Sequence, residues 1–352
     1  MNPDSIADFR SDTVTRPTLE MYEAMGRAEL GDDVLGDDPT VKDLEAEAAH
    51  RFGKEAAVFV PSGTMANQTA MMAWLRPGDE VLCEARCHVF NFEGGGIARL
   101  SGAQPRQISG CRGRMPLEAV KEILDTIRHG DEHQPRLRLM TVENTHNLSG
   151  GSILPIAYLE AVKKLAAEND LRVHLDGARI FNASVETGTT LREYGAVADS
   201  ISFCLSKGLA APAGSVLVGP RDFILEARRA RKVLGGAMRQ SGILAAAGLV
   251  AITTMVDRLV EDHGRARALA EGIQALSYLQ IDPGEVETNI LTFQVRTFPE
   301  GARALQAALE TRGVRSIAMS PDRMRMVTHK DITDRHLEMA LEAFQALNPE
   351  NR

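Results

Sequence analysis

Cysteine, long hydrophobic runs and an excess of basic charge are all scarce or missing in this chain of 352 residues. Its four cysteines are too few and too scattered for a disulfide framework, so we expect a reducing, cytoplasmic compartment. The longest apolar stretch, residues 242–256, is shorter than the roughly 20 residues that cross a bilayer. The start, MNPDSIADFRSD, lacks the apolar run of a signal peptide. Neither a membrane span nor secretion is predicted.

Charge and missing motifs exclude further classes. The chain has 40 Lys and Arg against 48 Asp and Glu, a net charge of −8, and no basic run, which argues against nucleic-acid binding. It has no GxGxxG after a strand, no P-loop, no HExxH and no GxSxG. Nicotinamide, nucleotide, zinc-protease and serine-hydrolase chemistry are therefore not expected.

What is present is the pattern of a globular α/β protein, with 44% hydrophobic and 25% charged residues. From about Lys54 onward, short apolar runs alternate with helical patterns such as residues 65–75 and 155–169. Runs that are apolar on both faces predict a mostly parallel sheet covered by helices on both sides. The predicted strands are AAVFV, EVLCE, LRLMTVE, LRVHLD, DSISFCL and GSVLVG.

The pattern changes after about Met255, where helical stretches and strands follow in the order of a smaller α+β domain. The first 45 residues, rich in proline and glycine, read as an arm without a core of its own. We therefore expect an arm over residues 1–45, a large domain over residues 46–255 and a small C-terminal domain over residues 256–352.

Three stretches could carry chemistry. In SFCLSKGL, Lys207 follows an apolar strand, where burial would favour the free amine that condenses with carbonyls. In LRVHLDGAR, Asp176 ends a predicted strand, where α/β proteins build their sites. Each has a plainer explanation: Lys207 as a lysine leaving the sheet edge, Asp176 as a helix cap or an ion pair with Arg179.

The third stretch, VPSGTMANQ, turns from a strand through Ser62, Gly63 and Thr64 into a helix. Such a junction offers hydroxyls and free N–H groups to a phosphate, although it is also an ordinary capped helix start. Together the three stretches supply a phosphate seat, a carboxylate and an amine. That is the set that holds pyridoxal phosphate, whose ring nitrogen needs a carboxylate and whose aldehyde needs a lysine.

Longer motifs carry a family resemblance over nearly the whole chain. FRSDTVTRPT, GDDVLGDDPTV, GKEAAVFVPSGTMAN, ENTHN, VHLDGARIFNA, CLSKGL, PAGSVLVG, GGAMRQSGILAAAG and RMVTH, in this order, closely resemble the L-threonine aldolases. That family has the aspartate-aminotransferase-like fold (fold type I) of pyridoxal-phosphate enzymes and belongs to the β-eliminating lyase group. The resemblance implies cleavage of threonine or allo-threonine to glycine and an aldehyde.

The resemblance also implies roles for individual residues. Lys207 matches the Schiff-base lysine, with Ser206 beside it, and Asp176 matches the partner of the pyridine nitrogen. Ser62, Gly63 and Thr64 match phosphate-binding positions, and Arg179, Arg325 and Ser11 match residues that bind the substrate carboxylate. His88 matches the histidine that stacks on the cofactor ring. His146 matches a second histidine near the substrate hydroxyl, and Lys232 and Arg239 match basic residues that reach a neighbouring subunit's cofactor phosphate.

The chain departs from the family at two points. Leu35 stands where many relatives have tyrosine, and LSGGSILP after ENTHN is longer than the common form. No metal is expected, because Cys83, Cys87 and His88 have no matching second pair of ligands.

The resulting interpretation is an enzyme that cleaves small β-hydroxy-α-amino acids, as a homodimer or homotetramer with shared active sites. The alternatives are a β-eliminating lyase or another pyridoxal-phosphate enzyme of the same fold, and a binding protein without cofactor. The base that takes the hydroxyl proton is His146 or His88. His146, in a polar turn, is expected to be the freer of the two.

Overall fold

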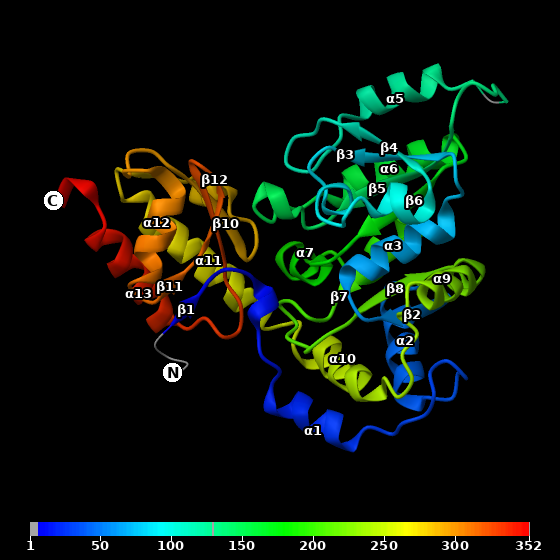
Figure 1. Ribbon diagram of the computed structural model, residues 1–352, viewed down its shortest axis with the longest axis horizontal. Helices are drawn as coiled ribbons and strands as arrows, with labels where there is room; N and C mark the ends of the chain where they lie inside the picture. Colours follow the sequence, from blue (N-terminus) through cyan, green and yellow to red (C-terminus); the bar gives the residue numbers. More distant parts are fainter. Residues whose placement is uncertain (1–5, 129, 352) are drawn as a thin grey trace.

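The computed structural model describes residues 6–128 and 130–351, and its largest element is a seven-stranded sheet (Figure 1). The strand order is β2-β8-β7-β6-β5-β3-β4, parallel from β7 to β4, with β8 antiparallel to both of its neighbours. The predicted α/β fold with a mostly parallel sheet is confirmed. The strands span Ala56–Val60 (β2), Asp79–Glu84 (β3), Gln104–Ile108 (β4), Arg136–Glu143 (β5), Arg172–Asp176 (β6), Ser200–Cys204 (β7) and Ser215–Gly219 (β8).

Helices cover both faces of this sheet, as successive residues of β2 illustrate. Val58 and Val60 pack in an apolar cluster with α3 (Gly63–Trp74) and α9 (Arg221–Val233). Ala57 and Phe59 belong to the cluster on the other face, which includes residues of α2, α6, α7 and α10. Successive side chains of a strand point to opposite faces, so both faces of β2 are buried. The other helices before residue 255 span Leu19–Arg27 (α1), Pro39–Phe52 (α2), His88–Asn91 (α4), Leu117–Thr126 (α5), Ile156–Glu168 (α6), Ile180–Thr187 (α7), Leu191–Ala196 (α8) and Gly242–Thr254 (α10).

The C-terminal part has its own sheet and its own core, seen beside the large sheet in Figure 1. Its four antiparallel strands lie in the order β12-β13-β10-β9. This is the predicted smaller α+β unit. The elements span Leu259–Gln274 (α11), Leu279–Gln280 (β9), Ile290–Val295 (β10), Gly301–Glu310 (α12), Val314–Arg315 (β11), Ile317–Ser320 (β12), Arg323–Val327 (β13) and Asp334–Ala346 (α13).

The N-terminal segment touches both parts. Strand β1 (Ala7–Asp8) pairs in parallel with β11, and Phe9 is buried in the C-terminal core. Met21 of α1 is buried in the large core, and α2 crosses the boundary that we expected at residue 45. The division into an arm and two domains remains a proposal, with the first 45 residues connecting the two cores.

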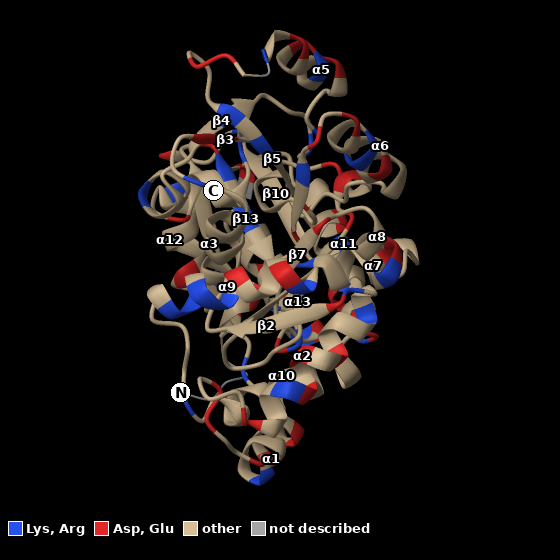
Figure 2. Cartoon of the chain, turned by 90° about the vertical axis from the view of Figure 1, so that its right-hand side faces the viewer, with Lys and Arg blue, Asp and Glu red and all other residues tan. Residues whose placement is uncertain are grey.

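Lys and Arg are interspersed with Asp and Glu on the helices seen in Figure 2. In the part of the chain that the structure describes, no single helix is long and apolar enough to cross a membrane. Only α10 and α11 taken together have that length and composition, and they are bent by 71°.

Candidate active site

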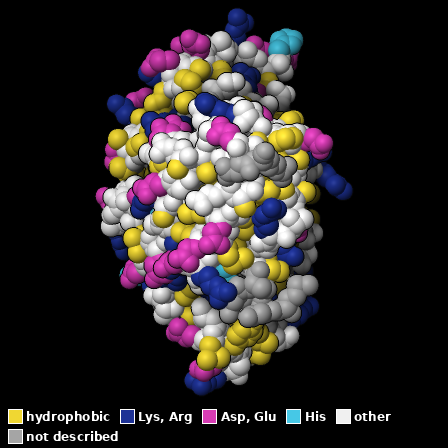
Figure 3. Space-filling model, turned by 90° about the vertical axis from the view of Figure 1, so that its left-hand side faces the viewer, with side chains coloured by type: hydrophobic (Ala, Val, Ile, Leu, Met, Phe, Trp, Pro, Cys, Tyr) yellow, Lys and Arg dark blue, Asp and Glu magenta, His cyan; other side chains and the backbone are white. Residues whose placement is uncertain are grey.

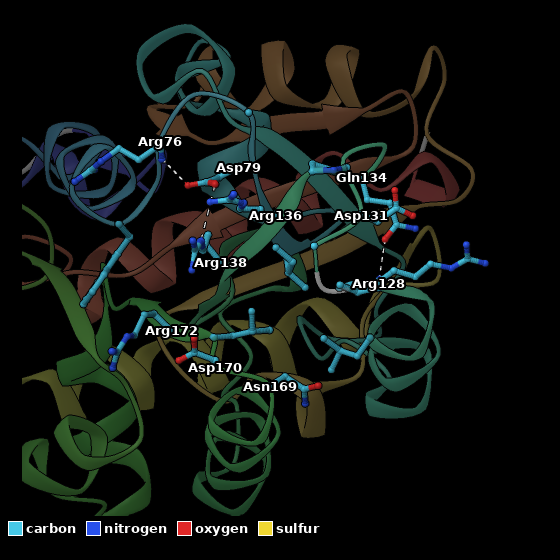
Figure 4. A pocket seen from close by; sticks show the side chains of 18 of the residues that line it. Arg76, Asp79, Arg128, Asp131, Gln134, Arg136, Arg138, Asn169, Asp170 and Arg172 are labelled. Atoms are coloured by element: carbon cyan, nitrogen blue, oxygen red, sulfur yellow. Dashed lines mark hydrogen bonds and ion pairs between the residues drawn. The ribbon is translucent and has the colours of Figure 1, made fainter.

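The part of the chain that the structure describes has two hollows that are candidates for the active site. The larger, with a volume of about 960 Å³, lies where β3, β5 and β6 begin. Figure 4 shows arginines around it, with Arg138 next to Asp79. The smaller hollow, about 190 Å³, lies where β6 and β7 end. Six of the predicted residues line this smaller cavity, and none of them lines the larger one: Gly63, Thr64, His88, Asp176, Ser206 and Lys207.

The N-terminus of α3 forms one wall of the cavity. Ser62 caps the helix by accepting a hydrogen bond from the N–H of Met65. Gly63 and Thr64 open into the cavity, where the first turn of a helix has N–H groups without intrahelical partners. A side chain at Gly63 would place its Cβ 2.7 Å from Cys204 Sγ, so only glycine allows this approach to β7. The wall fits a phosphate, with Ser206 also lining the cavity.

Asp176 ends β6 and is buried. Its Oδ1 accepts the N–H of Ala178 at 3.1 Å, and its Oδ2 accepts Asn67 Nδ2 at 2.8 Å. Among residues 6–128 and 130–351, no Lys, Arg or His side chain is within ion-pair distance of it. A buried carboxylate needs a positive partner. A protonated ring nitrogen in the cavity would supply that partner, so the site fits pyridoxal phosphate.

Lys207 follows β7 and lines the same cavity. Thr15 Oγ1 donates to its backbone carbonyl at 3.1 Å, which ties the N-terminal segment to the loop that carries the lysine. Within the described residues, its Nζ has neither a hydrogen bond nor an ion pair. The amine is therefore available to an aldehyde, and the predicted role of Lys207 as the Schiff-base lysine stays a prediction.

His88 begins α4 at the edge of the cavity. Its Nδ1 is 2.9 Å from Glu93 Oε1, so the neutral ring carries its proton on Nδ1 and leaves Nε2 as an acceptor. Burial lowers the pKa of His88, but the hydrogen bond to Glu93 and the charges of Asp176 and Glu143 outweigh it and raise the pKa. His88 is thus placed to lie against a ring held by Asp176.

Neither Arg179, which is buried, nor Arg325, which is partly buried, lines the cavity. Arg179 donates through Nε and Nη2 to the two oxygens of Asp12, both at 2.7 Å. Burial raises the pKa of Asp12, but Arg179 and Lys207 more than reverse this and hold it well below its usual range. The Nε and Nη2 of Arg179 are thus paired with Asp12 in this structure, and the predicted role of Arg179 in binding the substrate carboxylate stays a prediction.

Arg325 has capacity left for an anion. Its Nη1 donates to Asn147 Oδ1 at 3.0 Å and its Nη2 to the carbonyl of Arg10 at 3.3 Å, whereas its buried Nε has no partner among the described residues. Burial and the neighbouring Arg179 lower the pKa of Arg325, which means that added negative charge is favourable here. Ser11 caps the adjacent turn by accepting from the N–H of Thr13, itself a cavity residue.

The expectation that His146 lies freely in a polar turn is wrong. The side chain is fully buried, its Nε2 is 3.1 Å from Glu84 Oε2, and it does not line the cavity. A bridge to Ser152 holds its backbone, and Gly113 packs so closely that a Cβ there would be 2.6 Å from His146 Cγ. Sequence composition suggested exposure because it could not show these two loops folding over the ring.

Lys232 and Arg239 are exposed at and after the end of α9. Arg239 Nη1 is 2.8 Å from Asp32 Oδ2, and neither residue lines the cavity of its own chain. Their predicted reach to a neighbouring subunit stays a prediction. Leu35, in the motif GDDVLGDDP, is 75% exposed, so it adds an apolar side chain to the surface at that point.

Several cavity residues were not identified from the sequence, above all Asn67 and Glu93. The one available signal was a polar pair, Asn67 and Gln68, inside the otherwise apolar helix start MANQTAMMAW. Ligand atoms of His88, Glu93 and Asp176 also lie within 4.8 Å of one another, close enough to surround an ion. The expectation of no metal therefore stays a prediction.

Comparison with known proteins finds a family and several relatives that match most of the chain. The model of the beta-eliminating lyase family matches residues 8–296. A probable low-specificity L-threonine aldolase 2 of Arabidopsis thaliana is 44% identical over 343 residues, covering 97% of this chain and 96% of that protein. A low specificity L-threonine aldolase of Escherichia coli O157:H7 is 45% identical over 331 residues, covering 94% and 96%.

Solved structures share the fold at low sequence identity. A threonine aldolase of Leishmania major superposes with a TM-score of 0.81 at 19% identity, covering 97% of this chain and 99% of that one. A serine palmitoyltransferase of Sphingomonas wittichii gives 0.75 at 18% identity, covering 97% and 86%. The predicted aspartate-aminotransferase-like fold and the resemblance to threonine aldolases are both confirmed. With a matched family model over most of its length and close relatives across nearly all of it, the chain belongs to the beta-eliminating lyase family.

Proposed function

We propose that this protein is a pyridoxal-phosphate enzyme that cleaves L-threonine, L-allo-threonine and related β-hydroxy-α-amino acids to glycine and an aldehyde. The observation that carries the proposal is the shared cavity. Within the described residues, a lysine amine without a hydrogen-bond partner, a buried carboxylate with no cation at ion-pair distance and the N-terminus of a helix face one space of about 190 Å³. The names of the relatives, low-specificity L-threonine aldolases, support the same reaction.

When bound, pyridoxal phosphate supplies an aldehyde for amines and a ring that draws electrons from the bonds at the α-carbon of the substrate. Lys207 would hold the aldehyde, Asp176 the ring nitrogen, and the α3 N-terminus with Ser206 the phosphate. A carboxylate at this position would favour the protonated, electron-poor form of the ring.

The chain's own side chains then select which bond breaks. Arg325, with its free Nε, would bind the substrate carboxylate, with Ser11 and Arg179 behind it. Fixing the carboxylate turns the Cα–Cβ bond to the orientation that lets it break. His88 Nε2 is the histidine atom of the site that can accept the hydroxyl proton, whereas His146 is enclosed by other loops. The proposed base is therefore His88, acting directly or through water.

The test is product analysis with purified protein and added cofactor. Incubation with L-threonine, L-allo-threonine and phenylserine should release glycine and the matching aldehyde. Pyruvate and ammonia from hydroxyamino acids, without glycine, would instead assign β-elimination. Absence of a yellow, borohydride-reducible chromophore would contradict the use of the cofactor.

We also propose that the active enzyme is a homodimer or a homotetramer with shared sites. Large apolar side chains are exposed around α1 and near Lys232 and Arg239, which supports a subunit contact there: Leu19, Tyr22, Leu30, Leu35 and Val233. Figure 3 shows hydrophobic side chains gathered at the end of the molecule where α1 lies. Sedimentation of an active monomer would contradict this. All four cysteines are free thiols, which supports the proposed cytoplasmic location.

A further inference from the structure

A buried amide connects the two carboxylates of the cavity. Asn67 lies one turn into α3 and is 3% exposed. Its Nδ2 is 2.8 Å from Asp176 Oδ2 and also 2.8 Å from Glu93 Oε1, whose carboxylate in turn contacts His88 Nδ1. The NH₂ group of Asn67 therefore contacts both Asp176, which would hold the ring nitrogen, and Glu93, which contacts His88.

Two hydrogen-bond partners of its oxygen fix the orientation of the Asn67 amide. Its Oδ1 is 3.1 Å from His174 Nε2 and 2.7 Å from Ser202 Oγ. Ionised carboxylates only accept hydrogen bonds, so the NH₂ must face Asp176 and Glu93, and both His174 and Ser202 must donate to Oδ1. All four hydrogen-bonding positions of Asn67 are then filled, and a flipped amide would set oxygen against two carboxylates.

The hydrogen bonds continue beyond His174 in the same direction. Burial lowers the pKa of His174 to about 4, so the ring is neutral at pH 7 and its single N–H is on Nε2. Its Nδ1 accepts from Ser200 Oγ at 2.9 Å, and Ser200 Oγ accepts from Trp74 Nε1 at 2.8 Å. Each residue in the series from Trp74 to Asp176 thus donates a hydrogen bond to the next one. Hydrogen bonds arranged in such a series polarise and strengthen one another.

We propose that Asn67 is a positioning residue, which holds Asp176 and, through Glu93, His88 in one fixed arrangement around the bound ring. The inference rests on the proposed function, because it concerns the cofactor that this function requires. It predicts that deleting the NH₂ of Asn67 weakens cofactor binding, in addition to any effect on folding.

Gln68 offers a matched control on the same helix. Its Nε2 donates to the other oxygen of Glu93 at 2.6 Å, but Gln68 contacts neither Asp176 nor the cavity. Asn67→Ala and Gln68→Ala each remove one buried amide that touches Glu93. Asn67→Asp keeps the size and the acceptor for His174 and Ser202, so it preserves more of the packing than the alanine variant.

The experiment measures the dissociation constant of pyridoxal phosphate from the apoprotein by absorbance titration, together with the melting temperature of each apoprotein. We expect Asn67→Ala and Asn67→Asp to raise the dissociation constant of pyridoxal phosphate at least about tenfold, since hydrogen bonds to a charged group are lost. In Gln68→Ala the dissociation constant should stay within about threefold of the wild-type value, because the hydrogen bonds of Asp176 are intact. The kcat for threonine should fall with the affinity in the Asn67 variants.

Two results would overturn the inference: an unchanged cofactor affinity in whichever Asn67 variant folds, or an equal loss in Gln68→Ala at equal melting temperature. A wild-type chain that binds no pyridoxal phosphate would instead overturn the proposed function, and the inference with it.

Discussion

The two sides of the proposed site are built in different ways. The cofactor side comes from residues 62–207 of one sheet and its helices, and its buried carboxylates are held by neutral donors such as Asn67. The carboxylate side joins Asp12, Arg179 and Arg325 from distant parts of the chain, with two guanidiniums for one acid and an unpartnered Nε. Among the described residues, Asp176 on the cofactor side has no cation within ion-pair distance, and the carboxylate side has one carboxylate for two guanidiniums. A protonated ring would supply the cation, and an amino-acid carboxylate the second anion.

The largest effect should come from the lysine of the cofactor side. Lys207→Ala should lose nearly all turnover, because no other amine lines the cavity in the described residues. Borohydride should then fix no pyridoxyl group to the chain, as peptide mass spectrometry can check. Lys54→Ala is the control, since that partly buried lysine donates to the Ala198 carbonyl outside the site. Full activity in Lys207→Ala would reject the mechanism.

Replacing the Asp176 carboxylate by a neutral amide should cause a smaller loss of activity. Asp176→Asn should lower kcat by about 10² to 10³ with little change in KM, because an amide cannot stabilise charge on the ring nitrogen. Steady-state kinetics at saturating cofactor measures this. If kcat is unchanged while the cofactor stays bound, the carboxylate has another role.

On the carboxylate side we expect a substitution to change KM more than kcat. Arg325→Met should raise KM for threonine by about 10- to 150-fold, since a charged hydrogen bond to the substrate is lost, and should lower kcat less. Arg323→Met, exposed at the start of the same strand, should leave both constants unchanged. A larger effect on kcat than on KM would mean that the two sides are not separable.

The smallest effect concerns stability. His174 has a pKa of about 4 in the folded chain against about 6.5 when unfolded, so only the unfolded chain takes up this proton between those values. The folded state should lose up to about 3 kcal/mol as pH falls from 7 to 4. His174→Gln should flatten that part of the curve in urea unfolding at each pH. His50→Gln, at an exposed position of α2, should keep the wild-type slope.

The sequence predicted the cofactor side far better than the carboxylate side. Lys207 and Asp176 were found because strand ends are readable from local hydrophobic patterns, and parallel strands end at one edge. The burial of His146 and the pairing of Arg179 with Asp12 depend on loops separated by many residues, which periodicity does not register. Asn67 carried only a weak signal, because a polar residue on an apolar helix does not reveal its partners.

The N-terminal segment also has a consequence for synthesis. Strand β1 pairs with β11, and the N–H of Val327 donates to the carbonyl of Phe9, while Thr13 and Thr15 border the lysine. Residues 7–9 thus find these partners only after more than 300 further residues of the chain have been made. Contacts of such sequence separation form late. The large sheet can assemble during translation, whereas the N-terminal segment takes its place only once β11 and β13 have been made.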